Sequence, residues 1–143
     1  MRGKGISAPL DGKPVIPLDL MRGMRLAYNG QDSMSGIIAL QRDLEAEGGS
    51  LGILSEQIET GSHRASVIAV AEGRADICAI DCRTWHIAQR HEPAAREVAA
   101  VGWTARRLGL PMITSIHTPP AIVAKLRDIL ASARDSEALP AHP

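Results

Sequence analysis

Small hydroxyl residues and glycines gather at two places where an apolar segment gives way to an expected helix. The first is the run 28–36, Tyr-Asn-Gly-Gln-Asp-Ser-Met-Ser-Gly, and the second is the run 60–64, Thr-Gly-Ser-His-Arg. The first turn of a helix leaves backbone N–H groups without partners, and the helix dipole adds positive charge there. Turns of this composition are therefore suited to holding the oxygens of an anion.

The same turns have a simpler explanation, because Ser, Thr, Asp and Asn cap helices without any ligand. Capping alone would account for either turn taken singly. Two such turns on one edge of a sheet, with His63 in the second, favour a ligand site instead. His63 itself is open to three interpretations: a ligand contact, a half-exposed histidine bonded to a backbone carbonyl, or a catalytic base. We favour the ligand contact.

Apolar periodicity and turn residues predict that short strands and helices alternate along the chain. A single helical turn is expected at 17–23. We expect strands at 25–28, 57–60, 75–80, 97–101 and 111–114, and helices at 37–47, 65–72, 84–90 and 120–133. Alternation at this spacing is typical of βαβ units, so the expected fold is α/β, a three-layer sandwich with a mainly parallel sheet. Both hydroxyl-rich turns, and Asp81, then lie at the carboxyl ends of strands, where such sheets bind ligands.

Composition narrows the function classes. The chain has 143 residues, enough for one domain, and 16 Lys plus Arg balance 16 Asp plus Glu. No broad positive field is therefore available to hold a nucleic acid. No run reaches the roughly 18 apolar residues that span a bilayer, so no membrane insertion is expected. The start lacks the apolar core of a secretory signal, so the chain as given is expected in the cytoplasm.

Two cysteines and a histidine raise the possibility of a metal site. Cys78, Cys82 and His86 recur every four residues, which on one helix would place three ligands on a face. The apolar run that ends at 80 is an expected strand, however, and a strand would separate the two cysteines by about 13 Å. Buried thiols that act as small hydrophobic groups explain them better, and neither a metal nor another cofactor is expected.

Ser33, His63 and Asp81 are also the residue types of a hydrolytic triad. Ser33 does not lie in a Gly-x-Ser-x-Gly turn of the kind that exposes such a nucleophile in α/β hydrolases, since Gln31 and Ser35 occupy the two glycine positions. Reversible binding without catalysis is therefore the preferred interpretation, and a Ser/His hydrolase is the less favoured one.

Four motifs occur in order along most of the chain. Residues 25–36, Arg-Leu-Ala-Tyr-Asn-Gly-Gln-Asp-Ser-Met-Ser-Gly, form a strand followed by a D-x-S-x-S-G turn. Residues 60–66 and 69–76 read Thr-Gly-Ser-His-Arg-Ala-Ser and Ala-Val-Ala-Glu-Gly-Arg-Ala-Asp, and 79–81 and 102–111 follow. From about residue 18 to about residue 131 the chain resembles the phosphate/phosphonate-type substrate-binding proteins of ABC importers, which have the type II periplasmic-binding-protein fold.

The resemblance implies that the chain is the second of two α/β lobes that close on a ligand. It implies that hydroxyls and N–H groups of the first turn hold anion oxygens, that His63 bonds the same group, and that Asp81 faces the cleft. The ligand-binding set that it implies is Tyr28, Ser33, Met34, Ser35, Gly36, Ser62, His63 and Asp81. The ligand would be phosphate, phosphonate or a related small oxyanion, passed to an ABC transporter permease. Met34 departs from the hydroxyl residue that phosphonate-binding members often carry there.

The expected organisation follows from the same resemblance. Residues 1–19 would be an extended, poorly packed lead-in, 20–117 the ligand-binding lobe, 118–135 a C-terminal helix that packs on a first lobe, and 136–143 a frayed tail. Family members carry a first lobe and a signal peptide ahead of this region and are periplasmic. We therefore expect a truncated product, a fragment, or a descendant that pairs with another chain. The alternative function is an orphan lobe that self-associates, for example as a homodimer, through its exposed apolar surface without any ligand.

Overall fold

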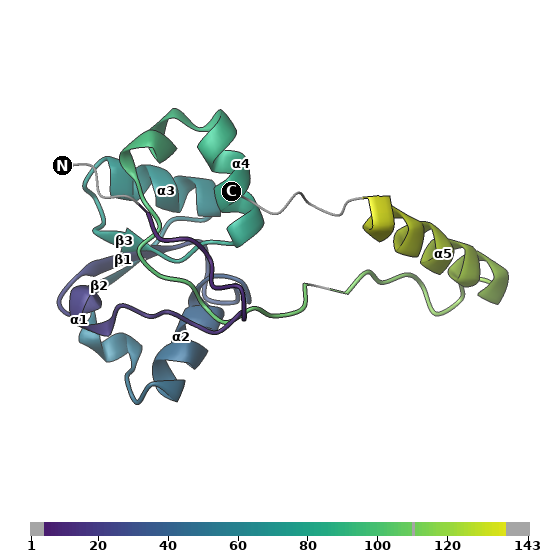
Figure 1. The fold of residues 1–143 in the computed structure, drawn as a ribbon, viewed down its shortest axis with the longest axis horizontal. Coiled ribbons are helices and arrows are strands. Elements are labelled where there is room, and N and C mark those ends of the chain that lie inside the picture. Colours follow the sequence, from purple (N-terminus) through teal and green to yellow (C-terminus); the bar gives the residue numbers. More distant parts are fainter. Residues whose placement is uncertain (1–4, 110, 137–143) are drawn as a thin grey trace. The chain divides into compact units, whose positions relative to one another are not determined.

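The structure is a computed structural model that describes residues 5–109 and 111–136 (Figure 1). It divides into two compact units, Met1–Arg107 and Leu108–Pro143. The first unit contains α1 (Leu18–Met21), β1 (Arg25–Tyr28), α2 (Ile37–Ala46), the 3-10 helix η1 (Leu51–Ile53), β2 (Glu56–Glu59), α3 (His63–Ala71), β3 (Ile77–Cys78), α4 (Cys82–His91) and the 3-10 helix η2 (Pro93–Glu97). The second unit contains α5 (Pro120–Ser136).

The three strands form a parallel sheet in the order β2-β1-β3, with β1 in the centre. Both neighbours pair with the same part of β1, since Leu26 lies opposite Gln57 on one side and opposite Ile77 on the other. The chain leaves each strand through a helix before it returns to the sheet, as parallel pairing requires. The α/β class expected from the sequence is confirmed.

Side chains of β1 alternate between two cores, which is why α2 and α3 lie on opposite faces of the sheet (Figure 1). Leu26 and Tyr28 pack with Ile37, Leu40 and Leu44 of α2. Ala27, which points the other way, packs with Ala69 of α3 and with Ala75. The two helices therefore cover opposite faces of the sheet. Each follows the carboxyl end of a strand, and because β1 and β2 are parallel, the first turns of α2 and α3 lie at the same rim of the sheet.

Capping residues set where two of the helices begin. The Ser62 hydroxyl accepts a hydrogen bond from the N–H of Ala65 at 3.1 Å, and the Asp81 carboxylate accepts one from the N–H of Thr84 at 2.9 Å. Each helix starts at the residue that follows its cap, so α3 and α4 begin at His63 and Cys82. These starts are two residues earlier than the apolar pattern predicts, because a cap is polar and adds no apolar signal.

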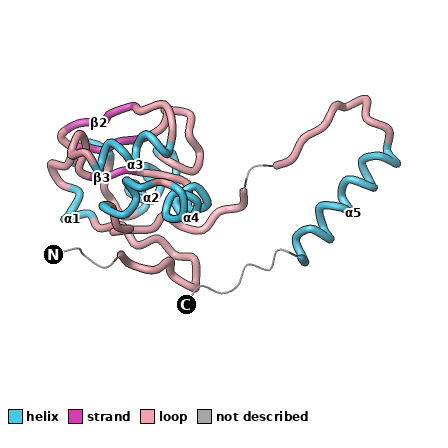
Figure 2. Tube along the Cα trace, turned by 90° about the horizontal axis from the view of Figure 1, so that it is seen from above, coloured by secondary structure: helices cyan, strands magenta, loops and turns pink. Residues whose placement is uncertain are grey.

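Two expected strands are wrong, and a third is shorter than predicted. Residues 93–97 form η2, whose first turn Glu92 caps, and the stretch that follows forms no strand. Residues 111–114 are exposed and form no ladder in the described part of the chain. The strand expected at 75–80 shrinks to Ile77–Cys78. A β-strand forms only where its backbone can hydrogen-bond to a neighbouring strand. Residues 77 and 78 pair with β1, whereas 97–101 and 111–114 have no strand beside them in the described part of the chain. Figure 2 shows how much of the chain is loop around the small sheet.

Residues 5–17 have no buried side chain, and they form hydrogen bonds with a later segment of the chain. Val15 and Trp103 exchange two backbone hydrogen bonds of 2.7 and 2.9 Å in an isolated antiparallel bridge. The N–H of Arg106 donates to the carbonyl of Gly12 at 2.8 Å, and the indole N–H of Trp103 donates to the carbonyl of Ile6 at 2.9 Å. The two segments lie side by side (Figure 1), so the first unit is closed by contacts between its early and late residues.

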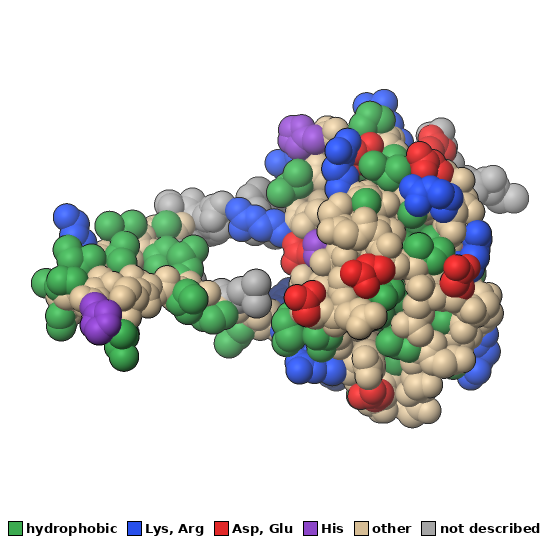
Figure 3. Space-filling model, turned by 180° about the vertical axis from the view of Figure 1, so that it is seen from behind, with side chains coloured by type: hydrophobic (Ala, Val, Ile, Leu, Met, Phe, Trp, Pro, Cys, Tyr) green, Lys and Arg blue, Asp and Glu red, His purple; other side chains and the backbone are tan. Residues whose placement is uncertain are grey.

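The helix α5 of the second unit agrees with the expected helix at 120–133. Apolar side chains of α5 are exposed, and Figure 3 shows them gathered along the helix. They are Ile122, Leu126, Ile129 and Leu130. In the described part of the chain no helix is long and apolar enough to cross a membrane. The frayed tail expected at 136–143 lies outside the described residues, except for Ser136 at the end of α5.

Candidate functional site

The two hydroxyl-rich turns meet at Ser35 and His63. The Ser35 Oγ lies 3.5 Å from the Nε2 of His63. The turns come together because β1 and β2 pair in parallel up to Tyr28 and Glu59, so both chains leave the sheet at the same rim. A separation of 3.5 Å is at the outer limit of a hydrogen bond, so both groups remain available to a third partner.

The start of α2 has no side-chain cap, which distinguishes it from α3 and α4. Its N-cap position is Gly36, which has no side chain to accept a hydrogen bond. Among the described residues, the N–H groups of Met34, Ser35 and Gly36 make no hydrogen bond. The turn therefore presents free donors at the positive end of a ten-residue helix. This arrangement is suited to an anion, whereas capping already explains Ser62 and Asp81.

Two acceptor oxygens crowd the point where this turn becomes α2. A Cβ added at Gly36 would lie 2.8 Å from the Asn29 Oδ1 and 2.9 Å from the Ser33 Oγ, closer than real Cβ atoms come. Only glycine therefore fits without a shift of the turn. The Asn29 Oδ1 is also buried without a hydrogen-bond partner in the described structure. Asn29 is not among the predicted site residues, and the signal that could have found it is a strand-ending Asn directly before Gly30.

His63 occupies a half-buried position at the first residue of α3. Burial lowers its pKa from the ordinary value of about 6.5, and the negative charge of Asp81 opposes the shift in part. The imidazole is therefore neutral at pH 7. Its Nδ1 is buried and finds no partner among the described residues. A histidine with one nitrogen facing Ser35 and the other unsatisfied has spare capacity to bind.

The other predicted residues have different environments. Tyr28 is buried, with 6% of its surface exposed, and packs against α2. It lines a separate hollow that neither Ser35 nor His63 lines. The Met34 side chain is 45% exposed. Of the eight predicted positions, the structure joins Ser35 and His63 by a direct contact and places Ser33 and Gly36 in the same turn.

The geometry does not assemble a catalytic triad. The serine that faces His63 is Ser35 rather than Ser33. The Asp81 carboxylate accepts from the backbone of Thr84, and within the described residues no hydrogen bond joins it to His63. Asp81 therefore acts on the imidazole through its charge alone, without orienting it as a triad aspartate does.

The two cysteines differ in exposure. Burial raises the pKa of the Cys78 thiol, on β3, to about 11, whereas Cys82 is exposed at the start of α4. In the part of the chain that the structure describes, no group of three His, Cys, Asp or Glu side chains is arranged to hold a metal ion.

Comparison with known proteins gives a family match. Residues 10–141 match the family described as "ABC transporter, phosphonate, periplasmic substrate-binding protein". The chain belongs to this family. Phosphonate-family proteins are substrate-binding components that work with an ABC transporter permease and bind a small ligand, so the resemblance expected from the four motifs is confirmed. The small parallel sheet with its helices is consistent with one lobe of their fold. No curated protein and no solved structure gives a significant match.

Proposed function

We propose that this chain forms one half of a ligand cleft and captures phosphate, phosphonate or a related small oxyanion without turning it over. The observation that carries the proposal is the 3.5 Å approach of Ser35 to His63 beside the uncapped start of α2. Membership of a substrate-binding family supports the same conclusion.

The donors come from three sources. The free N–H groups of residues 34–36 supply the positive end of α2, the hydroxyls of Ser33 and Ser35 donate from the same turn, and the Nε2 of His63 donates from α3 when it carries the proton. Hydrogen bonds to a charged partner contribute about 1.5–3 kcal/mol each, roughly twice as much as neutral ones. Several of them can replace the hydration shell of an oxyanion.

Ser62 and Asp81 have an indirect role in this proposal. Each caps a helix, and the caps fix where α3 and α4 begin. Ser62 thereby positions His63, the next residue. Asp81 adds a negative charge near the imidazole, which favours its protonated form. Recognition by a permease and the periplasmic setting are extended to this chain from its family, and they rest on the same proposal.

A second candidate function is self-association. It is favoured by exposed apolar side chains on α5 and by Met112, Ile113 and Ile116 in the segment before it. Exposed apolar surface of this kind commonly marks an interface. Sedimentation equilibrium, which gives the mass, and a phosphate titration, which gives the affinity, separate the two functions together. A monomer that binds oxyanion supports the first, and a dimer without oxyanion affinity supports the second.

A thermal-shift panel of phosphate, phosphite, methylphosphonate and sulfate tests the proposal. A ligand that binds only the folded state raises the melting temperature. At a ligand concentration of one hundred times Kd, it stabilises the folded state by about 2.7 kcal/mol. We expect at least one of these anions to stabilise the chain and Ser35→Ala to remove the effect. Ser55→Ala is the matched control, since Ser55 is exposed and its side chain makes no hydrogen bond in the described structure. Equal shifts in both variants, or none in the unaltered chain, would contradict the assignment.

A further inference from the structure

The segment that carries His63 contains two hydroxyl groups that contact each other. The Oγ1 of Thr60, which follows β2, lies 2.7 Å from the Oγ of Ser66 in α3. Ser66 is fully buried, with 0% of its surface exposed, and Thr60 is partly buried. His63 lies midway between the two in the sequence, so the contact closes the loop 60–66 around it.

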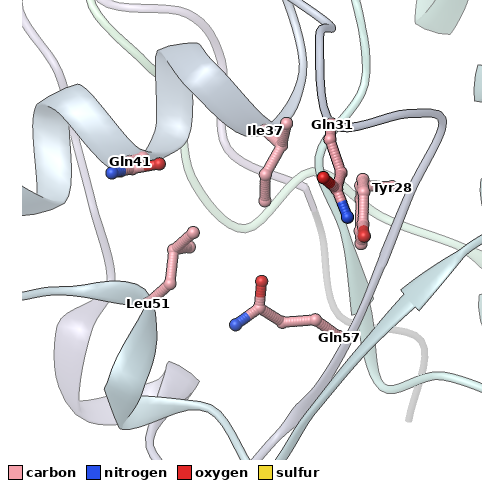
Figure 4. A pocket seen from close by; sticks show the side chains of 6 residues that line it. All are labelled: Tyr28, Gln31, Ile37, Gln41, Leu51 and Gln57. Carbon is pink, nitrogen blue, oxygen red and sulfur yellow. The ribbon is translucent and has the colours of Figure 1, made fainter.

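Thr60 also joins this loop to the end of β1. The carbonyl of Tyr28, the last residue of β1, accepts from the Thr60 N–H at 2.8 Å and lies 2.9 Å from the Thr60 Oγ1. The Tyr28 side chain, by contrast, lines the hollow beside α2 (Figure 4). Because the first hydroxyl-rich turn continues from Tyr28, Thr60 fixes one turn relative to the other.

The two hydroxyls carry one hydrogen each, which limits the bonds that form at one time. In one arrangement Thr60 donates to the Tyr28 carbonyl and Ser66 donates to Thr60. In the other, Thr60 donates to Ser66, and Ser66 donates to the Ser62 carbonyl at 3.2 Å. The bond between the hydroxyls is made in both arrangements, so neither group is left without a partner.

Helix capping does not account for Ser66. The cap of α3 is Ser62, whose hydroxyl accepts from the N–H of Ala65. Ser66 lies inside the helix, where alanine has a higher helix propensity and buries no polar group. A serine at this buried position is explained by its bond to Thr60, which alanine could not make.

We propose that Thr60 and Ser66 are positioning residues of the oxyanion site. Their hydroxyls hold the loop 60–66 in the path that brings the His63 Nε2 to 3.5 Å from the Ser35 Oγ. Neither hydroxyl touches the ligand, because both act through His63. Binding groups that are already held in place lose less freedom when a ligand arrives. The inference rests on the function proposed above, but the positioning itself is testable without a ligand.

The first test uses the full chain without ligand. Thr60→Val keeps the branched shape of the side chain and removes the hydroxyl, whereas Thr60→Ser keeps the hydroxyl. Spectra of ¹H–¹³C groups in the His63 ring and of the amides at 34–36 report on the two turns. We expect Thr60→Val to shift both sets of signals and Thr60→Ser to leave them close to those of the unaltered chain. Unchanged His63 signals in a folded Thr60→Val chain would overturn the proposal.

The second test measures the affinity for inorganic phosphate by titration in the same spectra. We expect Thr60→Val and Ser66→Ala to bind about fivefold more weakly, the factor that corresponds to the net free energy of one neutral hydrogen bond. Thr60→Ser should retain the affinity. Thr114→Val is the matched control, since it removes a hydroxyl contact of 2.8 Å, with Thr118, in the second unit. Asp76→Asn controls for lower stability alone, because Asp76 precedes β3, at the opposite end of the strands from the turns.

The outcomes separate this inference from the oxyanion function. Equal affinity in Thr60→Val and the unaltered chain would contradict the positioning role, as would an equal loss in Asp76→Asn. If phosphate gives no saturable shift in the unaltered chain while Thr60→Val still shifts the His63 signals, the oxyanion function alone fails. If Thr60→Val does not fold, Ser66→Ala decides, since alanine suits the helix: shifted His63 signals support the proposal and unchanged ones refute it.

Discussion

Arg107 binds the carboxylate of Asp43 through both terminal nitrogens of its guanidinium, although 64 positions separate the two residues. Asp43 lies in α2 with 4% of its surface exposed, and it also accepts from the N–H of Ala105 at 2.7 Å. The pair attaches the segment that follows Trp103 to the helix that carries the candidate site at its start. A buried carboxylate with three donors is satisfied, but it depends on all of them.

Removing Arg107 should destabilise the first unit. Arg107→Ala leaves a buried carboxylate with one donor, and loss of one partner of a buried pair costs about 3 kcal/mol. Urea denaturation followed by circular dichroism measures the change. Arg106→Ala is the control, because the exposed Arg106 side chain makes no ion pair in the described structure. Equal stability of the two variants would show that the Asp43 contact contributes nothing.

The oxyanion site should depend on pH through His63. Burial lowers the pKa of His63, so in the free protein the imidazole charges only below the range in which an unfolded histidine does. Stability from this group is complete above pH 6.5 and is lost as pH falls from there toward the lowered folded pKa. An oxyanion favours the charged form, so its stabilising effect should be greater at pH 5.5 than at pH 8.

The measurement is the phosphate-induced change in melting temperature across that range, with His63→Gln as the comparison. We expect the variant to lose the pH dependence. It should also bind phosphate at least about tenfold more weakly, because it lacks one hydrogen bond to a charged group. A pH dependence that persists in His63→Gln would assign it to the ligand's own titration or to another group.

Stability in acid should depend on Asp76. The Arg25 side chain and backbone N–H both donate to this carboxylate, at distances of 2.8 to 3.0 Å, and they lower its pKa to about 2. Because the folded pKa lies below the unfolded value, the pair stabilises the fold above about pH 4, and the contribution is lost as pH falls from 4 toward 2. Asp76→Asn should flatten the stability profile over that interval. Asp19→Asn, at an exposed position of α1, should not.

The two cysteines should differ in reactivity. Burial raises the pKa of Cys78 to about 11, so almost none of it is thiolate at neutral pH, whereas Cys82 is exposed. Iodoacetamide at pH 8 should modify one thiol in the folded chain and two in urea, as counted by mass spectrometry. Cys82→Ser should abolish the folded-state modification. Rapid labelling of Cys78 in that variant would show that β3 opens readily.

The sequence predicts the elements that carry their own signal. The helices from α2 to α5 and the strand at 25–28 have apolar periodicity or clear turn residues at their ends, and each is found within a few positions of its expected place. The strands expected at 97–101 and 111–114 are not found, because apolar residues mark a strand only where another strand is present to pair.

Side-chain roles at the site were harder to predict. Ser35 and Ser62 occupy similar turns in the sequence, yet Ser62 caps its helix while Ser35 faces the other turn. That difference depends on the backbone path at Gly36, which composition does not reveal. The burial of Asn29 and the pairing of Asp43 with Arg107 likewise arise from contacts between distant segments, and no local pattern reports them.

The bridge between Val15 and Trp103 has a mechanical consequence. The chain passes into the first unit through one partner of this bridge and passes out through the other, side by side and in opposite directions. A force that pulls on the flanking segments would therefore load these two hydrogen bonds before it reached the central sheet. Under tension, we expect the contacts of residues 6–15 with residues 100–106 to yield before the strands separate.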